Sequence, residues 1–290
     1  MNNFVSDKIK NSITKSSWIR KMFEKGGELK KKFGDNNVFD FSLGNPDVPP
    51  PVKFFETNAN LAQCRNPKNH SYMPNSGYIQ SREILARHLS TVYGKNITAD
   101  NLVMTSGAAG AINIMLKSIL NPHDEVILIA PYFAEYIFYI DNHNGIVKIA
   151  ESSENFDIDI SEIEKNLSPR TRAIIINSPN NPTGKVYTED NLKKLAQLLE
   201  AKSETNGRPI YIISDEPYRK IIYDDNKVPS ILKIYKNSLI ANSYSKDLSL
   251  PGERIGYALI NPDCAGKREL FDAFTLCNRI CGFVNAPATM

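Results

Sequence analysis

Residues 102–120 read LVMTSGAAGAINIMLKSIL, and this stretch indicates the fold class. The run Leu102–Thr105 has the length and apolar character of a buried strand, and SGAAGA supplies a glycine turn. Ala108–Leu120 then shows the apolar spacing of a helix. A strand that leads through a tight turn into a helix is typical of α/β proteins.

The same alternation of strand and helix continues along the chain, with a second helical pattern at Glu189–Ala201. Several apolar runs lack polar alternation, as expected for strands covered on both faces by helices. We therefore predict a three-layer αβα fold with a mostly parallel seven-stranded sheet within residues 46–290. Besides Leu102–Thr105, the expected strands are Glu125–Ala130, Gly145–Ile149, Ala173–Asn177, Ile210–Ser214, Leu239–Asn242 and Gly256–Ile260.

Residues 1–45 have a different character and predict an N-terminal arm. Apolar residues at helical spacing indicate a short amphipathic helix that needs another surface to cover it, namely Trp18, Ile19, Met22 and Phe23. We expect Gly26 and Gly27 to weaken this helix. Four prolines and a glycine in FSLGNPDVPPP (41–51) then interrupt regular structure.

The composition argues against several functional classes. Apolar residues make up 41% of the 290 residues and charged residues 23%, and the net charge of +3 favours neither a nucleic-acid nor a membrane partner. No apolar run has the length needed to span a bilayer, and no signal or transit peptide is recognisable. Because the four cysteines and four histidines show no metal-ligand spacing, we expect reduced thiols, no metal and a cytoplasmic location.

Polar residues follow four of the expected strands, and in open α/β sheets ligands bind beyond the carboxyl ends of the strands. The SGAAGA turn places the backbone N–H groups of Ala108 and Ala109 at a helix N-terminus, which suits an anion such as phosphate. The turn SPNNPTG (178–184) could present the amide of Asn181 to a ligand oxygen. Each of these two patterns is also explained by a turn alone.

An acid follows the third of these strands, in the sequence DEPY (215–218). A carboxylate at the end of a buried strand is costly without a partner. Asp215 therefore either caps the next helix or holds a cationic ligand atom, with Tyr218 close enough to reach the same ligand.

A lysine follows the fourth strand, in the sequence SYSKDLSLPGER (243–254). Lys246 alone is more simply explained as a solvated surface charge. Ser243, Ser245 and Arg254 nevertheless offer two hydroxyl groups and a fork-shaped cation, which together suit a phosphate.

The four strand ends together supply an anion site, an amide, a carboxylate, a phenol and a lysine. One ligand class needs all five, a phosphorylated pyridine aldehyde, which is pyridoxal 5'-phosphate. Its aldehyde needs a lysine to form a Schiff base, and its ring nitrogen needs an acid to stay protonated.

The motifs SPNNPTG, SDEPY and SYSKDLSLPGERIGY, in this order and at these separations, resemble the fold-type I aminotransferases of class I and II, which include aspartate aminotransferase. The similarity runs from FSLGNPD near residue 41 to NAPATM at residue 290. The resemblance implies a pyridoxal-phosphate-dependent aminotransferase with a ping-pong mechanism. An L-amino acid would give its amino group to the cofactor, and a 2-oxo acid would then accept it.

The resemblance also implies the catalytic residues. Lys246 would form the internal aldimine and then move a proton between the substrate Cα and the cofactor C4'. Asp215 would pair with the protonated pyridine nitrogen. Asn181 and Tyr218 would bond the 3'-oxygen, and Gly44 in SLGNPD would lie with Asn181 near the substrate.

Further cofactor contacts follow from the same resemblance. Phe133, in APYFAEY, would stack on the ring, although core packing is its alternative role. Tyr72, in HSYMPNSG, matches a tyrosine that family members lend to the phosphate of the neighbouring subunit. The phosphate would otherwise be bound by Ala108, Ala109, Ser243, Ser245 and Arg254.

Members of this family are considerably longer and carry the arginine that holds the substrate carboxylate in a C-terminal small domain. The resemblance implies that this chain lacks that domain and reaches only the start of a long interdomain helix before Met290. It also implies that residues 1–45 combine the N-terminal arm with part of the small domain. Because such arms pack on a partner subunit, we expect a homodimer.

Two alternatives keep the cofactor but change the function. A carbon–sulfur lyase of the same fold would share every cofactor residue named above. A catalytically inactive pyridoxal-phosphate-binding module is the other alternative, and it is disfavoured because residues before 41 are too few for a winged helix.

Overall fold

The computed structural model describes residues 4–41, 44–67 and 71–282. The chain divides into two compact units, Met1–Asp47 and Val48–Met290. We describe each unit separately.

The first unit consists mainly of one long helix, α1 (Asp7–Phe33), followed by the short 3-10 helix η1 (Asp35–Asn37). The expected weakening at Gly26–Gly27 is wrong, because α1 continues through both glycines. Gly26 is buried, and a Cβ atom there would lie 2.9 Å from Oδ2 of Asp40. The missing side chain thus lets this carboxylate approach the helix. The predicted apolar face at Trp18, Ile19 and Phe23 lies outside the described side chains.

The second unit is built on a seven-stranded sheet with the order β1-β7-β6-β5-β4-β2-β3. Neighbouring strands are parallel except at β7, which is antiparallel to both β1 and β6. All seven predicted strands are confirmed, with ends that differ by two residues at most. They are β1 (Leu102–Ser106), β2 (Glu125–Ala130), β3 (Ile146–Glu151), β4 (Thr171–Asn177), β5 (Tyr211–Asp215), β6 (Ser238–Ser243) and β7 (Ile255–Ile260).

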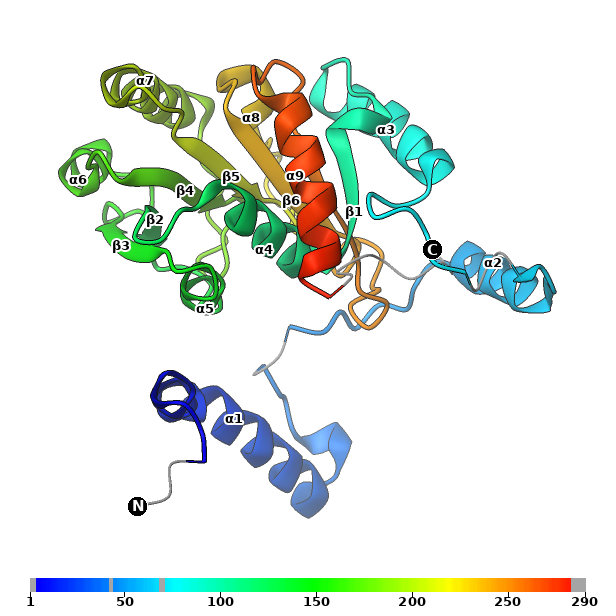
Figure 1. Cartoon of the computed structure of the whole chain (residues 1–290). Helices are drawn as coiled ribbons and strands as arrows, with labels where there is room; N and C mark the ends of the chain where they lie inside the picture. Colours follow the sequence, from blue (N-terminus) through cyan, green and yellow to red (C-terminus); the bar gives the residue numbers. More distant parts are fainter. Residues whose placement is uncertain (1–3, 42–43, 68–70, 283–290) are drawn as a thin grey trace. The chain divides into compact units, whose positions relative to one another are not determined.

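Helices cover both faces of this sheet and complete the three predicted layers (Figure 1). Helices α4 (Gly107–Ile119), α5 (Tyr136–Asp141) and α9 (Lys267–Ile280) contribute to the core on one face. The core on the other face includes α3 (Ile79–Tyr93), α6 (Ile160–Asn166), α7 (Glu189–Asn206) and α8 (Ile231–Ile234). The remaining elements of this unit are α2 (Val52–Gln63), which has no buried residue, and the 3-10 helix η3 (Ala99–Asn101).

Alternate residues of each central strand enter opposite cores. On β5, Ile212 belongs to the core under α3, α7 and α8, whereas Ile213 belongs to the core under α4, α5 and α9. Each fully buried isoleucine contributes roughly 1.5–3 kcal/mol of hydrophobic stabilisation before conformational entropy is subtracted. Burial on both faces explains why these strands are apolar throughout.

The parallel strands β4, β5 and β6 bring polar residues together at one edge of the sheet. Asn177 is paired with Asp215, and Asp215 with Ala241, in the register of the three strands. The loops that carry the SPNNPTG, DEPY and SYSKDLSLPGER motifs therefore leave the sheet side by side.

Two expectations concern other parts of the chain. Within the described ranges, no helix combines the length and hydropathy needed to cross a membrane. The predicted start of an interdomain helix before Met290 falls outside the described residues, since α9 ends at Ile280 and the described residues end at Gly282.

Candidate active site

The turn between β1 and α4 forms an anion-binding end of the site. α4 begins at Gly107, whose φ of +70° favours glycine, and the N–H groups of a first helical turn have no partner within the helix. Ala108 and Ala109 lie in this first turn. A Cβ atom on Gly256 of β7 would lie 2.5 Å from the carbonyl carbon of Gly107. The glycine at 256 therefore lets β7 pack directly under the turn.

A cation and two hydroxyl groups lie at the same turn. Nη2 of Arg254 lies 2.8 Å from the point that a Cβ atom of Gly107 would occupy, and Nη1 donates to the carbonyl oxygen of Pro251 at 3.0 Å. Ser243 is buried and pairs with Gly256 in the sheet register, while its hydroxyl donates to that of Ser245 at 3.1 Å. Guanidinium, hydroxyl and helix N–H donors together form a donor set that fits a phosphate dianion.

Asp215 is the acid at the end of β5, and it is 7% exposed. The phenol of Tyr136 donates to Oδ2 of Asp215 at 2.6 Å. Oδ1 is also buried, and no described group hydrogen-bonds to it. The pKa of Asp215 is raised to about 7, mainly by burial. The Tyr136 hydrogen bond opposes this rise, and the charge of nearby Glu216 adds to it.

The unpaired Oδ1 atom of Asp215 shows whether the site fits a cofactor with a protonated pyridine nitrogen. A buried carboxylate oxygen without a donor is unfavourable, and a cationic N–H group on a ligand would satisfy it. The position of Asp215 is fixed independently, because Nδ2 of Asn177 donates to its backbone carbonyl at 2.8 Å. The residues present therefore fit the ring nitrogen of pyridoxal 5'-phosphate.

The lysine faces the aromatic residue of the neighbouring loop. Nζ of Lys246 lies 5.8 Å from the ring centroid of Tyr218, and Nδ2 of Asn181 lies 3.5 Å from the Tyr218 hydroxyl. Burial lowers the pKa of the Lys246 amine, which favours its neutral, nucleophilic form. Burial and the charge of Asp215 raise the pKa of the Tyr218 phenol.

The structure assembles most, but not all, of the predicted residues. Phe133 is 36% exposed, and its ring meets that of Tyr136 edge to face at a centroid distance of 5.5 Å. Tyr72 is 91% exposed, and its role at the phosphate of a neighbouring subunit stays a prediction. Gly44 belongs to the first unit, so its role near the substrate stays a prediction.

Sequence reasoning missed two residues that act on the acid, Tyr136 and Asn177. Tyr136 lies three positions after Phe133 in APYFAEY and begins the short helix α5, so its closeness in sequence to the predicted Phe133 was a usable signal. Asn177 is the last residue of β4, and both polar atoms of its side-chain amide form hydrogen bonds. Nδ2 donates to the backbone carbonyl of Asp215, and Oδ1 accepts from the backbone N–H of Asn181 at 2.6 Å. One side chain thus ties the SPNNPTG loop to Asp215.

The site geometry defines a class of protein, namely an α/β protein with a candidate phosphate site, a buried acid and a partly buried lysine at the same sheet edge. The sequence matches the aminotransferase class I and II family over residues 36–284. This match covers most of the chain, so the protein belongs to the aminotransferase class I and II family, whose cofactor is pyridoxal 5'-phosphate.

Individual relatives agree with the family match. The probable aspartate aminotransferase of Methanocaldococcus jannaschii is 30% identical over 268 residues, and the aspartate aminotransferase of Thermotoga maritima is 35% identical over 228 residues. These alignments cover 92% and 77% of this chain but 66% and 58% of the two relatives. The chain therefore spans about three-fifths to two-thirds of their length.

Solved structures show the same fold. An aminotransferase from Eubacterium rectale has a TM-score of 0.93 and 41% identity, covering 99% of this chain and 73% of that one. The aspartate aminotransferase of Thermotoga maritima has a TM-score of 0.84 and 31% identity, covering 98% of this chain and 72% of that one.

Proposed function

We propose that this chain acts in a pyridoxal-phosphate-dependent aminotransferase, which moves an amino group from an L-amino acid to a 2-oxo acid by a ping-pong mechanism. The observation that carries the proposal is the unpaired, buried oxygen of Asp215 at the same sheet edge as Lys246. When bound, pyridoxal 5'-phosphate supplies an aldehyde that condenses with amines and a pyridinium ring that stabilises negative charge at the substrate Cα.

Phosphate binding orients the cofactor in this proposal. The N–H groups of Ala108 and Ala109 and the guanidinium of Arg254 meet at the start of α4, and the Ser243–Ser245 hydroxyl pair lies on the adjoining strand end. These donors would bind the phosphate oxygens and so orient the ring. Phe133 would stack on the ring.

Asp215 holds a proton on the pyridine nitrogen in this proposal. With its pKa near 7 in the cofactor-free chain, the carboxyl gives up its proton readily when a ring nitrogen lies beside Oδ1. The resulting ion pair offsets the burial cost of the carboxylate. Tyr136 keeps the carboxyl group in place through Oδ2.

Lys246 is the proposed proton carrier. Its amine would hold the cofactor through the aldehyde and, when a substrate amine takes its place, would accept the substrate Cα proton and return it at C4'. Tyr218 and Asn181 would donate hydrogen bonds to the 3'-oxygen of the cofactor. Asn181 and Gly44 are each proposed as substrate contacts. The lowered pKa of Lys246 suits a general base at neutral pH.

The assembly is also proposed. Tyr72 is 91% exposed on its own chain, which leaves its phenol accessible to the phosphate of a neighbouring copy in a homodimer. We also propose a cytoplasmic location and assign residues 1–45 to the arm with part of the small domain, and residues 46–290 to the cofactor-binding large domain. The four free thiols support a reducing compartment.

A half-reaction tests the proposed function. The full chain is incubated with pyridoxal 5'-phosphate and then with L-aspartate, the donor suggested by the names of the relatives. The account predicts conversion of the cofactor to its amine form, with oxaloacetate released and no free ammonia. Ammonia and pyruvate from cystathionine would instead indicate a carbon–sulfur lyase, and an unchanged spectrum with every amino acid donor would indicate a non-catalytic module.

A further inference from the structure

Tyr218 and Lys246 belong to two neighbouring turns, which contact each other through two pairs of side chains. The first turn follows β5 and spans residues 217–220, and the second follows β6 and spans residues 245–248. On one side, Nζ of Lys246 lies over the Tyr218 ring at 5.8 Å. Each turn also presents a charged residue one or two positions further along the chain, Lys220 and Asp247.

The first turn is anchored firmly to the core. Nη1 of Arg219 lies 2.9 Å from Oε2 of Glu216, which is 2% exposed, and the guanidinium lies 4.7 Å from the centroid of the Tyr93 ring. Oε2 of Glu216 also accepts from the Tyr93 hydroxyl at 2.8 Å. Because Arg219 lies between Tyr218 and Lys220, this network fixes the backbone from which both side chains project.

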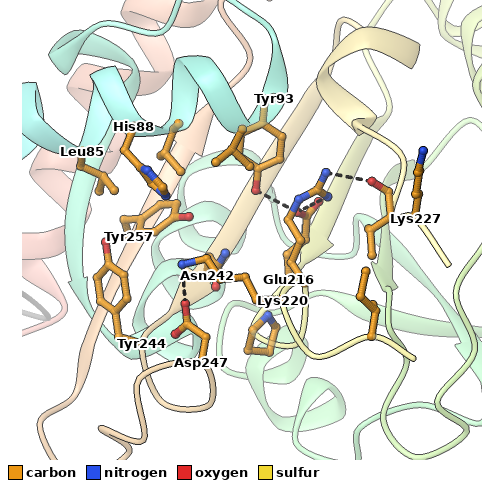
Figure 2. A pocket seen from close by; sticks show the side chains of 16 residues that line it. Leu85, His88, Tyr93, Glu216, Lys220, Lys227, Asn242, Tyr244, Asp247 and Tyr257 are labelled. Atoms are coloured by element: carbon orange, nitrogen blue, oxygen red, sulfur yellow. Dashed lines mark hydrogen bonds and ion pairs between the residues drawn. The ribbon is translucent and has the colours of Figure 1, made fainter. Parts of the chain in front are cut away.

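The second turn is linked to the first by an ion pair. Nζ of Lys220 lies 2.9 Å from Oδ2 of Asp247, as the dashed line in Figure 2 shows. The Asp247 side chain is only 11% exposed, and its Oδ1 atom is buried without a hydrogen-bond partner in the described chain. Its charge also helps to raise the pKa of Tyr244, to about 12, although burial is the larger cause. Asp247 is thus a buried charge facing Lys220.

A cavity lies behind this ion pair. It has a volume of about 310 Å³, and its wall includes Glu216, Arg219, Lys220, Asp247 and Tyr244 (Figure 2). Close-packed side chains normally transmit position between neighbouring loops, and this cavity removes such packing here. The link between the two turns on this side therefore depends on the Lys220–Asp247 contact.

We propose that Lys220 and Asp247 are positioning residues that set the place of the Lys246 amine relative to Tyr218. The inference rests on the proposed function, since the position of the amine matters for bonding the cofactor aldehyde. Neither residue touches the reacting atoms. The ion pair fixes the second turn against the anchored first turn, and Lys246 follows because it is the immediate neighbour of Asp247.

The test uses the full chain loaded with pyridoxal 5'-phosphate and reads the visible absorbance of the lysine–cofactor bond against pH. The variants are Lys220→Gln, Asp247→Asn, the double variant and the charge exchange K220D/D247K. Lys236→Gln is the matched control, because Lys236 pairs with Glu200 and its side chain has the same 56% exposure as that of Lys220. Cofactor affinity and the melting temperature are measured in parallel.

We expect each single variant to weaken cofactor binding by roughly threefold to tenfold and to shift the pH midpoint of the absorbance by about half a unit or more. The double variant should be no worse than Asp247→Asn, the charge exchange should recover part of the loss, and Lys236→Gln should match the wild type. If Asp247→Asn melts early, Lys220→Gln decides the question, because Lys220 is largely exposed.

Two results would overturn the inference. One is a wild-type midpoint in Lys220→Gln, and the other is additive effects of the two single variants, since independent residues do not form a positioning pair. Failure of the premise that Lys246 bonds the cofactor gives a different result, because the wild-type chain itself would then show no visible absorbance with the cofactor. A lyase or a non-catalytic module would keep that absorbance and is distinguished by the half-reaction above.

Discussion

Acids are buried at both ends of the parallel part of the sheet, but their surroundings differ. At the start of β2, Glu125 is 1% exposed and Asp124 is 5% exposed, while at the end of β5 Asp215 is 7% exposed. Burial alone therefore does not distinguish them. The distinction lies in the partners that each carboxylate has within the chain.

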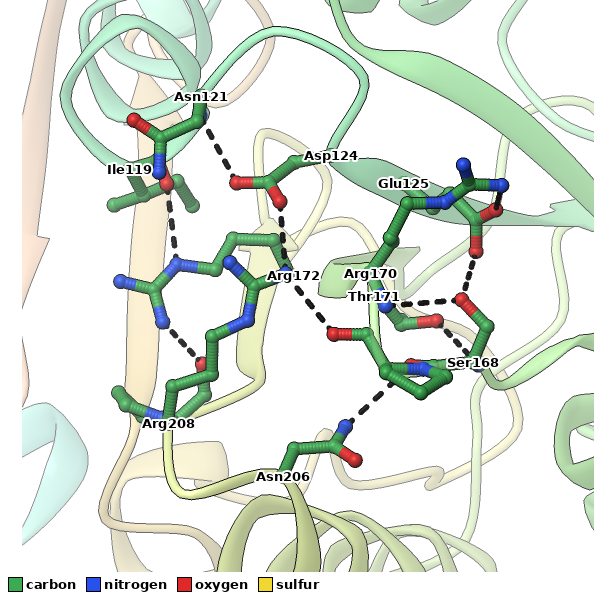
Figure 3. Close-up of polar contacts among 12 residues, drawn as sticks. Ile119, Asn121, Asp124, Glu125, Ser168, Arg170, Thr171, Arg172, Asn206 and Arg208 are labelled. Atoms are coloured by element: carbon green, nitrogen blue, oxygen red, sulfur yellow. Dashed lines mark hydrogen bonds and ion pairs between the residues drawn. The ribbon is translucent and has the colours of Figure 1, made fainter.

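The acids at the start of β2 are fully paired (Figure 3). Glu125 meets Arg170 at 3.1 Å through Oε1 and accepts from the Ser168 hydroxyl at 2.6 Å through Oε2. Asp124 meets Arg208 at 2.7 Å through Oδ1 and accepts from the backbone N–H of Asn121 at 2.9 Å through Oδ2. All four oxygens of this cluster have partners from the chain itself.

Asp215 has a neutral phenol on one oxygen and no described partner on the other. Its pKa rises to about 7, mainly because burial disfavours the charge. The comparison teaches that a buried acid paired with a cation of the chain maintains the fold, whereas Asp215, which has one unpaired oxygen and no cation in the described chain, is available to a cationic ligand. Substitutions at the two ends of the strands should therefore have opposite consequences.

The largest expected effect is on the chemistry of Asp215→Asn. Without a carboxylate the cofactor ring nitrogen loses its proton, and the rate of the half-reaction should fall by roughly 10²–10⁴-fold. Stopped-flow absorbance of the cofactor measures this rate. Asp124→Asn is the matched control at the other end of the sheet, and it should keep the wild-type rate per folded molecule. Equal losses in both variants would remove the distinction between the two ends.

The stability of the cofactor-free chain should depend on pH through Asp215. Because the folded pKa of about 7 exceeds the ordinary value of 3.8, the folded state binds this proton more tightly than the unfolded chain. A rise in pH from about 4 to about 7 therefore lowers the free energy of unfolding, by at most about 4 kcal/mol. Urea titrations of the wild type and Asp215→Asn should show that the free energy of unfolding of the wild type falls relative to that of the variant as the pH rises. A constant difference would contradict the assigned protonation.

Glu125→Gln should destabilise the fold without affecting the site. The substitution removes the charge and one of the two acceptor oxygens, so either Arg170 or Ser168 loses its buried acceptor and faces an amide N–H group. We expect this to cost about 2–4 kcal/mol in the free energy of unfolding. The exposed pair Lys202–Glu164, at 3.5 Å, provides the control, and Glu164→Gln should change stability by less than about 0.5 kcal/mol. Denaturant melts measure both. Weakened cofactor binding by folded Glu125→Gln would show that the two ends are coupled.

Tyr136→Phe should have the smallest effect. It removes the hydrogen bond that lowers the pKa of Asp215, so the carboxyl should be harder to ionise and cofactor affinity should fall by roughly threefold to tenfold. Tyr235→Phe is matched to it, because the buried Tyr235 hydroxyl also donates at 2.6 Å, to the carbonyl oxygen of Ile210. That control should lose stability and keep the affinity. A wild-type affinity in Tyr136→Phe would show that Asp215 does not depend on the phenol.

The fold was largely predictable from the sequence because strands buried on both faces have a local signature. Runs such as Glu125–Ala130 carry their own apolar pattern, and the polar residue that follows each run lies at the ligand-binding edge in any parallel sheet. Lys246 and Asp215 could be singled out in this way. Their assigned roles stay predictions until the variants are tested.

The rest depends on contacts between distant residues, which no local pattern encodes. The Tyr136–Asp215 bond joins residues 79 positions apart, and the Lys220–Asp247 pair joins two separate turns. At Gly26 of α1, the carboxylate of Asp40 lies where a side chain would otherwise stand. Each of these features requires knowledge of which segments become neighbours, and only the tertiary structure supplies it.

Covalent attachment of the cofactor to one lysine is the central claim, and borohydride reduction tests it most directly. The full chain is mixed with pyridoxal 5'-phosphate, reduced and digested, and the modified peptide is identified by mass spectrometry. The account predicts a pyridoxyl group on Lys246 at near-equimolar yield and no visible absorbance in Lys246→Ala. Label spread evenly over surface lysines, or an unchanged absorbance in Lys246→Ala, would contradict it.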